Sequence, residues 1–179
     1  MDKNIVVLAG SPRKESSTDR LVAAFTEGAT GAGHTLTTFR AADMKIGGCL
    51  GCNHCFQEVG VCVQKDDMQM ILDALRKSDT LVLASPLYFW SVTSQLKRVI
   101  DRTYALLKEG SSIKNAVLLM TCGDNSVAAA EPSIAIFRQI CSFLKWKEVG
   151  IIVVPGIQDP QDIYGRPELE QAKRLGVLR

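Results

Sequence analysis

Short apolar runs alternate with longer segments of helical spacing along the chain, and this alternation restricts the fold more than any other feature. The runs cover Asn4 to Ala9, roughly His34 to Phe39, Thr80 to Ala84, Asn115 to Met120 and Gly150 to Val154. Runs that stay apolar without alternation are typical of parallel strands, mostly buried on both faces. Because short right-handed crossovers join such strands, the sequence predicts an α/β fold: a doubly wound, five-stranded parallel sheet with helices on both faces.

The segments between the strands repeat apolar residues three or four positions apart, as helices that cover a sheet do. Their stripes are Leu21, Val22 and Phe25, then Met68, Ile71, Leu72 and Leu75, then Leu96, Val99, Ile100, Tyr104 and Leu107. Pro132 and Pro167 each stand where a helix can begin, and residues 155–166 are expected to be loop. In such sheets ligands bind beyond the carboxyl ends of the strands, so we expect function in the loops that follow them.

Length and charge narrow the functional classes. The 179 residues suit one domain over residues 1–179. Lys and Arg number 21 against 19 Asp and Glu, and the net charge of +2 lacks the basic excess of nucleic-acid-binding proteins. The first apolar run is too short for a secretory or membrane segment, and Gly10 and Pro12 interrupt it. We therefore expect a cytoplasmic protein that binds neither nucleic acid nor membrane.

The loop after the first strand, residues 10–18, has the composition of a phosphate site. Three hydroxyls and two cations gather there: Ser11, Ser17, Thr18, Arg13 and Lys14. Ser16 can cap the following helix with Asp19 completing a capping box, so a plain capped turn with exposed cations is the alternative. Two cations beside a helix amino terminus are unfavourable unless an anion lies between them, and this favours phosphate binding.

Two further loops follow the third and fourth strands. The first carries large apolar and aromatic side chains where a turn is usually polar: Pro86, Leu87, Tyr88, Phe89 and Trp90. Such side chains can cover a flat ring, and the alternative is that they fill the core or an interface between subunits. The second offers Cys122 and a close backbone approach at Gly123. A phosphate cradle, a ring platform and a backbone edge on one rim make FMN the economical ligand.

The cysteine-rich loop at about residues 47–63 is the sharpest local signal. Cys49, Cys52, Cys55 and Cys62 follow the spacing C-x2-C-x2-C-x6-C, and glycines flank them. This compact spacing is typical of [4Fe–4S] ligation, whereas four-cysteine zinc sites more often use two separated pairs. Zinc and free or oxidisable thiols are the alternatives. Cys141 lies in an apolar helical run and is expected in the core.

Together these segments resemble the flavodoxin-like NAD(P)H-dependent FMN reductase family and, within it, the iron-sulfur flavoproteins, over nearly the whole chain. The residues that carry the resemblance are Gly10 to Arg13 with Ser17 and Thr18, Cys49 to Cys55, Asp66 to Met68, Ser85 to Trp90, and Lys97 with Asp101 and Arg102. The resemblance implies that the first group binds the FMN phosphate and that the loop at Ser85 lines the isoalloxazine. Trp90 departs from the family, which often has glycine there.

The expected activity follows from the predicted cofactors, FMN and an iron-sulfur cluster. FMN would take a hydride from NAD(P)H and pass electrons to a small acceptor or to an iron-sulfur centre, with no side-chain acid or base required. A non-enzymatic flavodoxin-type electron carrier and a cysteine-based redox-sensing module are the alternatives. Because Tyr88, Phe89 and Trp90 form a large apolar patch, we also expect a homodimer or homotetramer.

Overall fold

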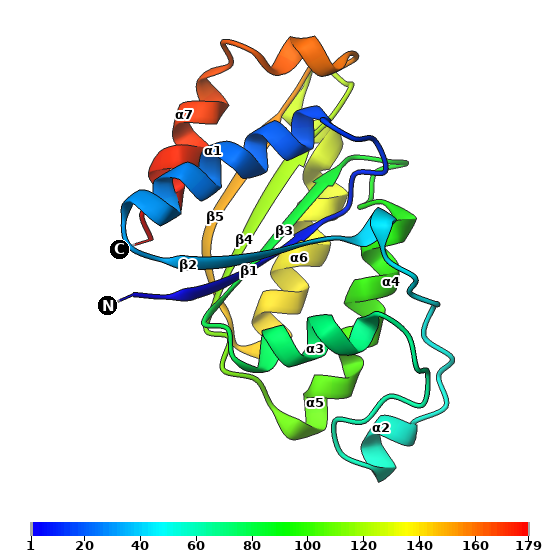
Figure 1. The fold of residues 1–179 in the computed structure, drawn as a ribbon. Coiled ribbons are helices and arrows are strands. Elements are labelled where there is room, and N and C mark those ends of the chain that lie inside the picture. Colours follow the sequence, from blue (N-terminus) through cyan, green and yellow to red (C-terminus); the bar gives the residue numbers. More distant parts are fainter. Residues whose placement is uncertain (1, 179) are drawn as a thin grey trace.

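The computed structural model describes residues 2–178 and contains one sheet whose neighbouring strands are all parallel (Figure 1). The strands are β1 (Asn4–Ala9), β2 (Thr35–Arg40), β3 (Thr80–Pro86), β4 (Asn115–Thr121) and β5 (Lys147–Val154). Their order across the sheet is β2-β1-β3-β4-β5. The chain winds from β1 to one side and then to the other, so the switch point lies between β1 and β3. The predicted doubly wound, flavodoxin-like fold is confirmed.

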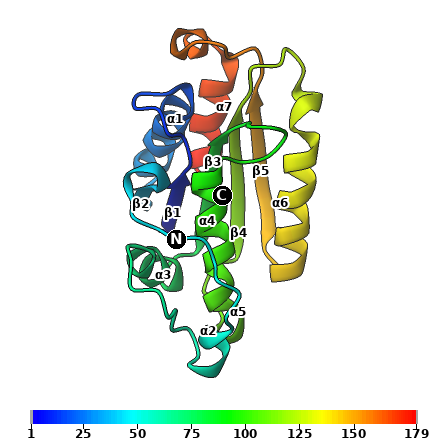
Figure 2. The same ribbon diagram turned by 90° about the vertical axis from the view of Figure 1, so that its right-hand side faces the viewer.

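Helices cover both faces of the sheet (Figures 1 and 2). One face packs against α1 (Ser17–Gly31) and α7 (Pro167–Gly176), and the other against α3 (Met68–Arg76), α4 (Ser94–Arg102) and α6 (Glu131–Leu144). The two remaining α-helices are the single turns α2 (His54–Gln57) and α5 (Leu106–Glu109). Short 3-10 turns span Ala41–Asp43, Thr103–Ala105, Val127–Ala130 and Pro160–Ile163.

The core divides into two apolar layers, one on each side of the sheet. Alternate residues of each central strand enter opposite layers: Val6 and Leu8 of β1 pack with α3 and α4, while Ile5 and Val7 pack with α1 and α7. This arrangement explains why the central strands are apolar at every position. Glycines at the contact of α1 with α7 allow their backbones to touch, because a Cβ on Gly28 would collide with the carbonyl oxygen of Lys173.

Three predicted features differ from the structure. The strands were expected to be mostly buried on both faces, but β2 and β5 are the edge strands: every residue of β2 is partly or fully exposed, and only Ile152 and Val154 of β5 are buried. The helical stretch that begins near Leu96 is interrupted, because α4 ends at Arg102 and a 3-10 turn separates it from α5. The segment 155–166 is not loop throughout, since the 3-10 turn Pro160–Ile163 lies within it.

The segment Val127–Leu144 is long and apolar enough to cross a membrane, by length and composition alone. It includes α6, whose side chains Ile134, Phe137 and Cys141 are buried against the sheet. Its other side is also apolar in places, since Ile136 and Phe143 are exposed. A core-facing helix that is apolar on its outer side has a surface suited to a further contact.

Candidate functional site

Four loops meet at the carboxyl rim of the sheet and enclose a cavity of about 220 Å³. Ten residues that the sequence indicated line it: Ser11, Arg13, Ser16, Ser17, Thr18, Pro86, Leu87, Tyr88, Cys122 and Gly123. They come from the end of β3, the first turn of α1 and the loops after β1, β3 and β4, and β1 and β3 flank the switch point of the sheet. The cavity is therefore where ligands bind in open parallel sheets.

The loop after β1 ends in a fully formed capping box. The Ser16 hydroxyl accepts from the backbone N–H of Asp19 at 3.1 Å, and the Asp19 carboxylate accepts from the N–H of Ser16 at 2.9 Å. The first backbone N–H groups of α1, those of Ser17 and Thr18, have no carbonyl acceptor within the helix. They lie at the positive end of the helix dipole. The predicted cap is confirmed, and it leaves these two amides free to bind an anion at the cavity.

Gly10 lets this loop approach α4 closely. Its N–H donates to the carbonyl of Ala84 at 2.8 Å, and its carbonyl accepts from the Thr93 hydroxyl at 2.7 Å. A Cβ at this position would lie 2.7 Å from the Cβ of Leu96. Only glycine therefore fits where β1, β3 and α4 meet.

Lys14 does not join Arg13 at the cavity. It lines a shallow hollow on the β2 side of the loop, together with Asp19 and Arg40. Arg40 forms an ion pair with Asp19 and donates to the carbonyl of Arg13 at 3.1 Å. The prediction that both cations converge on one site is wrong for Lys14. Arg40 holds the loop in place from the β2 side.

The loop after β3 divides into two parts. Pro86, Leu87 and Tyr88 line the cavity, whereas Phe89 and Trp90 are not among its lining residues. These two aromatic residues form a tight turn in which both have left-handed backbones, with φ of 46° and 60°. Hydrogen bonds between Tyr88 and Ser91 in both directions close the turn, which leaves Phe89 94% and Trp90 59% exposed. The turn thus presents its aromatic side chains to solvent beside the cavity.

The end of β4 contributes the Thr121 hydroxyl to the cavity, and the loop after it contributes the buried Cys122 thiol. Burial, the largest effect, raises the pKa of Cys122, so its thiol stays protonated near neutral pH. The Thr121 hydroxyl lies 2.9 Å from that of Thr18 and ties the end of β4 to the first turn of α1.

The loop after β5 completes the cavity and was not identified from the sequence. It contributes Ile157, Gln158, Asp159 and Pro160. Gln158 donates to the carbonyl of Gly123 at 2.6 Å, and the Asp162 carboxylate accepts from the N–H groups of Gln158 and Asp159. These hydrogen bonds lower the pKa of Asp162. The signal available in the sequence was the position of this loop directly after a strand.

The four cysteines of the predicted motif line a second, separate hollow of about 30 Å³. Cys49 and Cys52 are exposed and Cys55 and Cys62 half-buried. Burial raises the pKa of Cys55, and repulsion from the other three thiolates adds to the shift. Within residues 2–178 no three His, Cys, Asp or Glu side chains are close enough to hold a metal ion. The structure therefore brings the four thiols to one hollow without a closed ligand set.

The cysteine-rich loop lies away from the rim cavity. The loop with α2 extends toward the opposite end of the molecule from the rim in both views (Figures 1 and 2). The two sites share no lining residue. Cys141, by contrast, is in the core as predicted, and burial raises its pKa to about 11.

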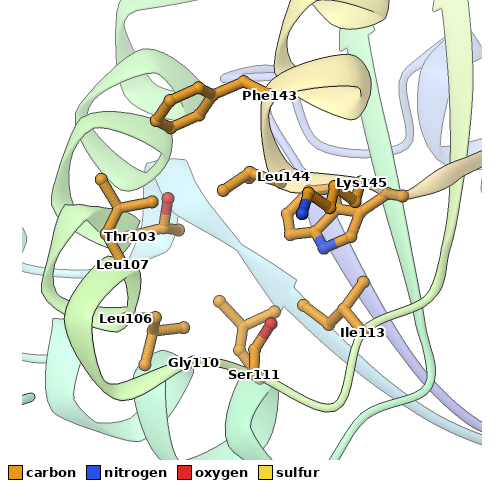
Figure 3. Close-up of a pocket in the computed structure, with 11 residues that line it drawn as sticks. Thr103, Leu106, Leu107, Gly110, Ser111, Ile113, Phe143, Leu144 and Lys145 are labelled. Carbon is orange, nitrogen blue, oxygen red and sulfur yellow. The ribbon is translucent and has the colours of Figure 1, made fainter.

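A larger cavity, of about 350 Å³, lies at the amino ends of β4 and β5. Side chains from α5 and from the end of α6 face one another across it, among them Leu106, Phe143 and Leu144 (Figure 3). None of the chemical motifs contributes to its walls. Size alone therefore does not mark the functional site, because the polar donors gather at the opposite rim.

The fold and the rim cavity define the class: a flavodoxin-like α/β protein with a ligand site at the carboxyl ends of its strands. Residues 3–156 match the model of the NADPH-dependent FMN reductase family, so the chain belongs to that family. This confirms the resemblance carried by the motifs of the rim loops.

Known relatives agree with this assignment. An iron-sulfur flavoprotein of Methanocaldococcus jannaschii is 32% identical over 162 residues, which cover 90% of this chain and 80% of that protein. An iron-sulfur flavoprotein of Archaeoglobus fulgidus is 36% identical over 97 residues, 54% of this chain and 44% of that protein.

Solved structures share the fold. An NAD(P)H:quinone oxidoreductase from Methanothermobacter marburgensis superposes with a TM-score of 0.76 at 21% identity, over 99% of this chain and 96% of its own. An FMN-dependent NADH-azoreductase from Bacillus anthracis, solved with FMN, gives 0.69 at 14% identity over 98% of both chains. At these identities the two structures establish the shared fold.

Proposed function

We propose that this chain holds FMN in the rim cavity, takes electrons from NAD(P)H and passes them to a small acceptor or to an iron-sulfur centre. The observation that carries this proposal is the capped amino terminus of α1 at the switch point of the sheet. There the amides of Ser17 and Thr18 lie beside Arg13 in the wall of one cavity. Free helix amides together with a guanidinium suit a phosphate monoester.

The residues of the cavity would bind and orient the cofactor. Arg13 and the start of α1 hold the phosphate, Pro86, Leu87 and Tyr88 cover one side of the ring, and the backbone near Gly123 meets its polar edge. FMN, when bound, supplies hydride acceptance and electron release. The cavity volume of about 220 Å³ lies below the roughly 300 Å³ of pockets that enclose a ligand. One face of the ring would therefore stay open to donor and acceptor.

We further propose that the cysteine-rich loop binds a [4Fe–4S] cluster through Cys49, Cys52, Cys55 and Cys62. Four thiolate donors are the ligand set that such clusters use, and all four line one hollow. The relatives named iron-sulfur flavoproteins support the same assignment. Because these thiols form no closed set within residues 2–178, the loop would tighten when the centre is built.

An anaerobic absorption spectrum, taken after FMN, iron and sulfide are supplied, tests both parts. We expect resolved flavin bands with a broad additional shoulder that is lost on reduction. Flavin bands alone would mean that FMN is the one redox centre and that the cysteines bind zinc or remain free thiols. A chain that shows no flavin bands would contradict the central proposal.

Two other activities predict different behaviour toward nicotinamides. A flavodoxin-type carrier would need a partner reductase, whereas this protein should reduce its bound FMN with NADH or NADPH alone. Arg13 in the wall of the cavity, together with a net charge of +2, favours the reductase over a strongly acidic carrier. A redox-sensing module would change its assembly on cysteine oxidation and show no nicotinamide oxidation.

A further inference from the structure

Arg102 is the most deeply buried charged side chain in contact with the cysteine-rich loop. It is the last residue of α4, and its side chain is only 1% exposed. Its terminal nitrogen Nη1 donates to the carbonyl of Gly47 at 3.1 Å, and Nη2 donates to the sulfur of Cys62 at 3.4 Å. Arg102 therefore contacts the loop near its beginning and near its end.

Asp66 completes this connection. Its carboxylate accepts from both terminal nitrogens of the Arg102 guanidinium, Nη1 at 2.6 Å and Nη2 at 2.9 Å. The same carboxylate also accepts from the N–H of Gly47 at 3.0 Å and from that of Met68 at 3.1 Å. The pair thus joins the two ends of the loop to each other, to α4 and to the start of α3.

Other cations hold the loop only through its backbone. Arg76 donates to the carbonyl of Gly60 at 2.8 Å, and Lys108 donates to that of Phe56 at 2.8 Å. Within residues 2–178, Arg102 is the one side chain that donates a hydrogen bond to any of the four motif sulfurs. A buried ion pair is costly to desolvate and is a weak means of stabilising a fold, so its position calls for a role beyond stability.

We propose that Arg102 is a positioning residue for the cysteine-rich loop. With Asp66 it closes the neck of the loop, where Gly47 meets Cys62 and Asp66, and it holds the Cys62 sulfur at the hollow that the other three thiols line. The inference rests on the proposed function of these thiols as ligands. A charged N–H donor to a ligand sulfur supports negative charge there and sets its direction. Lysine cannot replace it, because a single ammonium cannot make the planar fork that reaches Asp66, Gly47 and Cys62 together.

Two matched variants of the full-length, FMN-loaded chain test this role. Arg102→Lys keeps the charge but loses the fork, and Arg76→Lys makes the same change at an arginine that contacts the loop but no sulfur. Hydrogen exchange of the amides in residues 47–66 is measured first, without metal. We expect exchange at the neck to be at least about tenfold faster in Arg102→Lys, as the loss of a charged hydrogen bond implies, and little changed there in Arg76→Lys.

Cobalt(II) titration of the same proteins then reports on the thiols through the thiolate-to-metal absorption bands. We expect Arg102→Lys to bind Co²⁺ at least about tenfold more weakly than the parent, by the same reasoning, and Arg76→Lys to bind like the parent. If Arg102→Lys folds poorly, as its flavin content would show, the uncharged double variant Arg102→Gln with Asp66→Asn is compared instead.

Three results would contradict the inference. If hydrogen exchange at the neck is unchanged in the Arg102 variant, the positioning role is overturned, even if the variant has altered enzyme activity. Faster exchange with unchanged Co²⁺ affinity would overturn the claim that closing the neck positions the thiols. A parent chain that binds no Co²⁺ would contradict the role of the thiols as ligands and, with it, this inference, while the FMN proposal would stand on its own spectrum.

Discussion

Arg13 and Lys14 are adjacent in sequence, yet only Arg13 lines the rim cavity. Glu15, which follows them, has a left-handed backbone with φ of 52°, within the turn that precedes the Ser16 cap. Lys14→Ala is therefore a matched control for Arg13→Ala. Arg13→Ala should weaken FMN binding by about 1–3 kcal/mol, because a charged hydrogen bond to the phosphate is lost.

Quenching of FMN fluorescence on titration with the protein measures this affinity. Lys14→Ala removes the same charge from the net total but should leave the dissociation constant close to that of the parent. Equal losses in the two variants would mean that Arg13 acts only through general charge, and no loss in Arg13→Ala would remove it as the anchor.

Trp90 occupies a left-handed backbone position, with φ of 60°, that glycine adopts without cost. We expect Trp90→Gly to be more stable than Trp90→Ala by about 1 kcal/mol, since both variants lack the indole and only the alanine keeps the Cβ conflict. Urea unfolding gives the difference in free energy. Equal stabilities would show that the turn relaxes when the side chain is removed and that the tryptophan alone imposes the strain.

At the scale of elements, the 3-10 turn Pro160–Ile163 shapes the cavity through one carboxylate. Amides of Gln158 and Asp159 lower the pKa of Asp162 below its ordinary value of 3.8. A lowered folded-state pKa contributes stability that is present above the ordinary pKa and is lost as the pH falls through the folded value. Asp162→Asn should therefore lower the urea midpoint at pH 7, and its difference from the parent should shrink below about pH 4.

The Ser17 hydroxyl donates to the carbonyl of Pro160 at 3.4 Å, so this turn also touches the start of α1. We expect Asp162→Asn to weaken FMN binding at pH 7 in addition to its effect on stability. Glu170→Gln, at an exposed position in the first turn of α7, is a control for loss of a carboxylate from the same region. A pH-independent difference between Asp162→Asn and the parent would refute the protonation argument.

The elements that the sequence predicted well are those governed by local rules. The Ser16 and Asp19 cap depends on residues three apart, and the strands depend on apolar runs, so both could be inferred without a structure. The contribution of Gln158 and Pro160 to the cavity depends on contacts with residues 35 and 143 positions away. Arg102 reaches Cys62 across 40 positions, which the spacing of the cysteines does not reveal. The exposure of β2 follows from strand order, which the apolar pattern leaves open.

At the scale of the whole molecule, apolar side chains remain on the outside near the rim. Tyr88 is 42% exposed, and Phe89 and Trp90 are more exposed still. Ser133 at the start of α6 donates to the carbonyl of Trp90 at 2.8 Å, so this aromatic turn is held next to the helix whose outer side is partly apolar. A face of this kind is stabilised when a second copy covers it.

We therefore expect a homodimer or homotetramer with the aromatic turn at an interface. Light scattering of the FMN-loaded chain should give the mass of two or four copies, and the double substitution Phe89→Ser with Trp90→Ser should shift it toward one. Phe143→Ser, at the far end of α6 and 73% exposed in the single chain, is the matched control and should leave the mass unchanged. If Phe143→Ser alone dissociates the protein, the interface lies at the other end of α6. If the parent with FMN bound is a monomer, the aromatic turn contacts solvent or substrate and not a second copy.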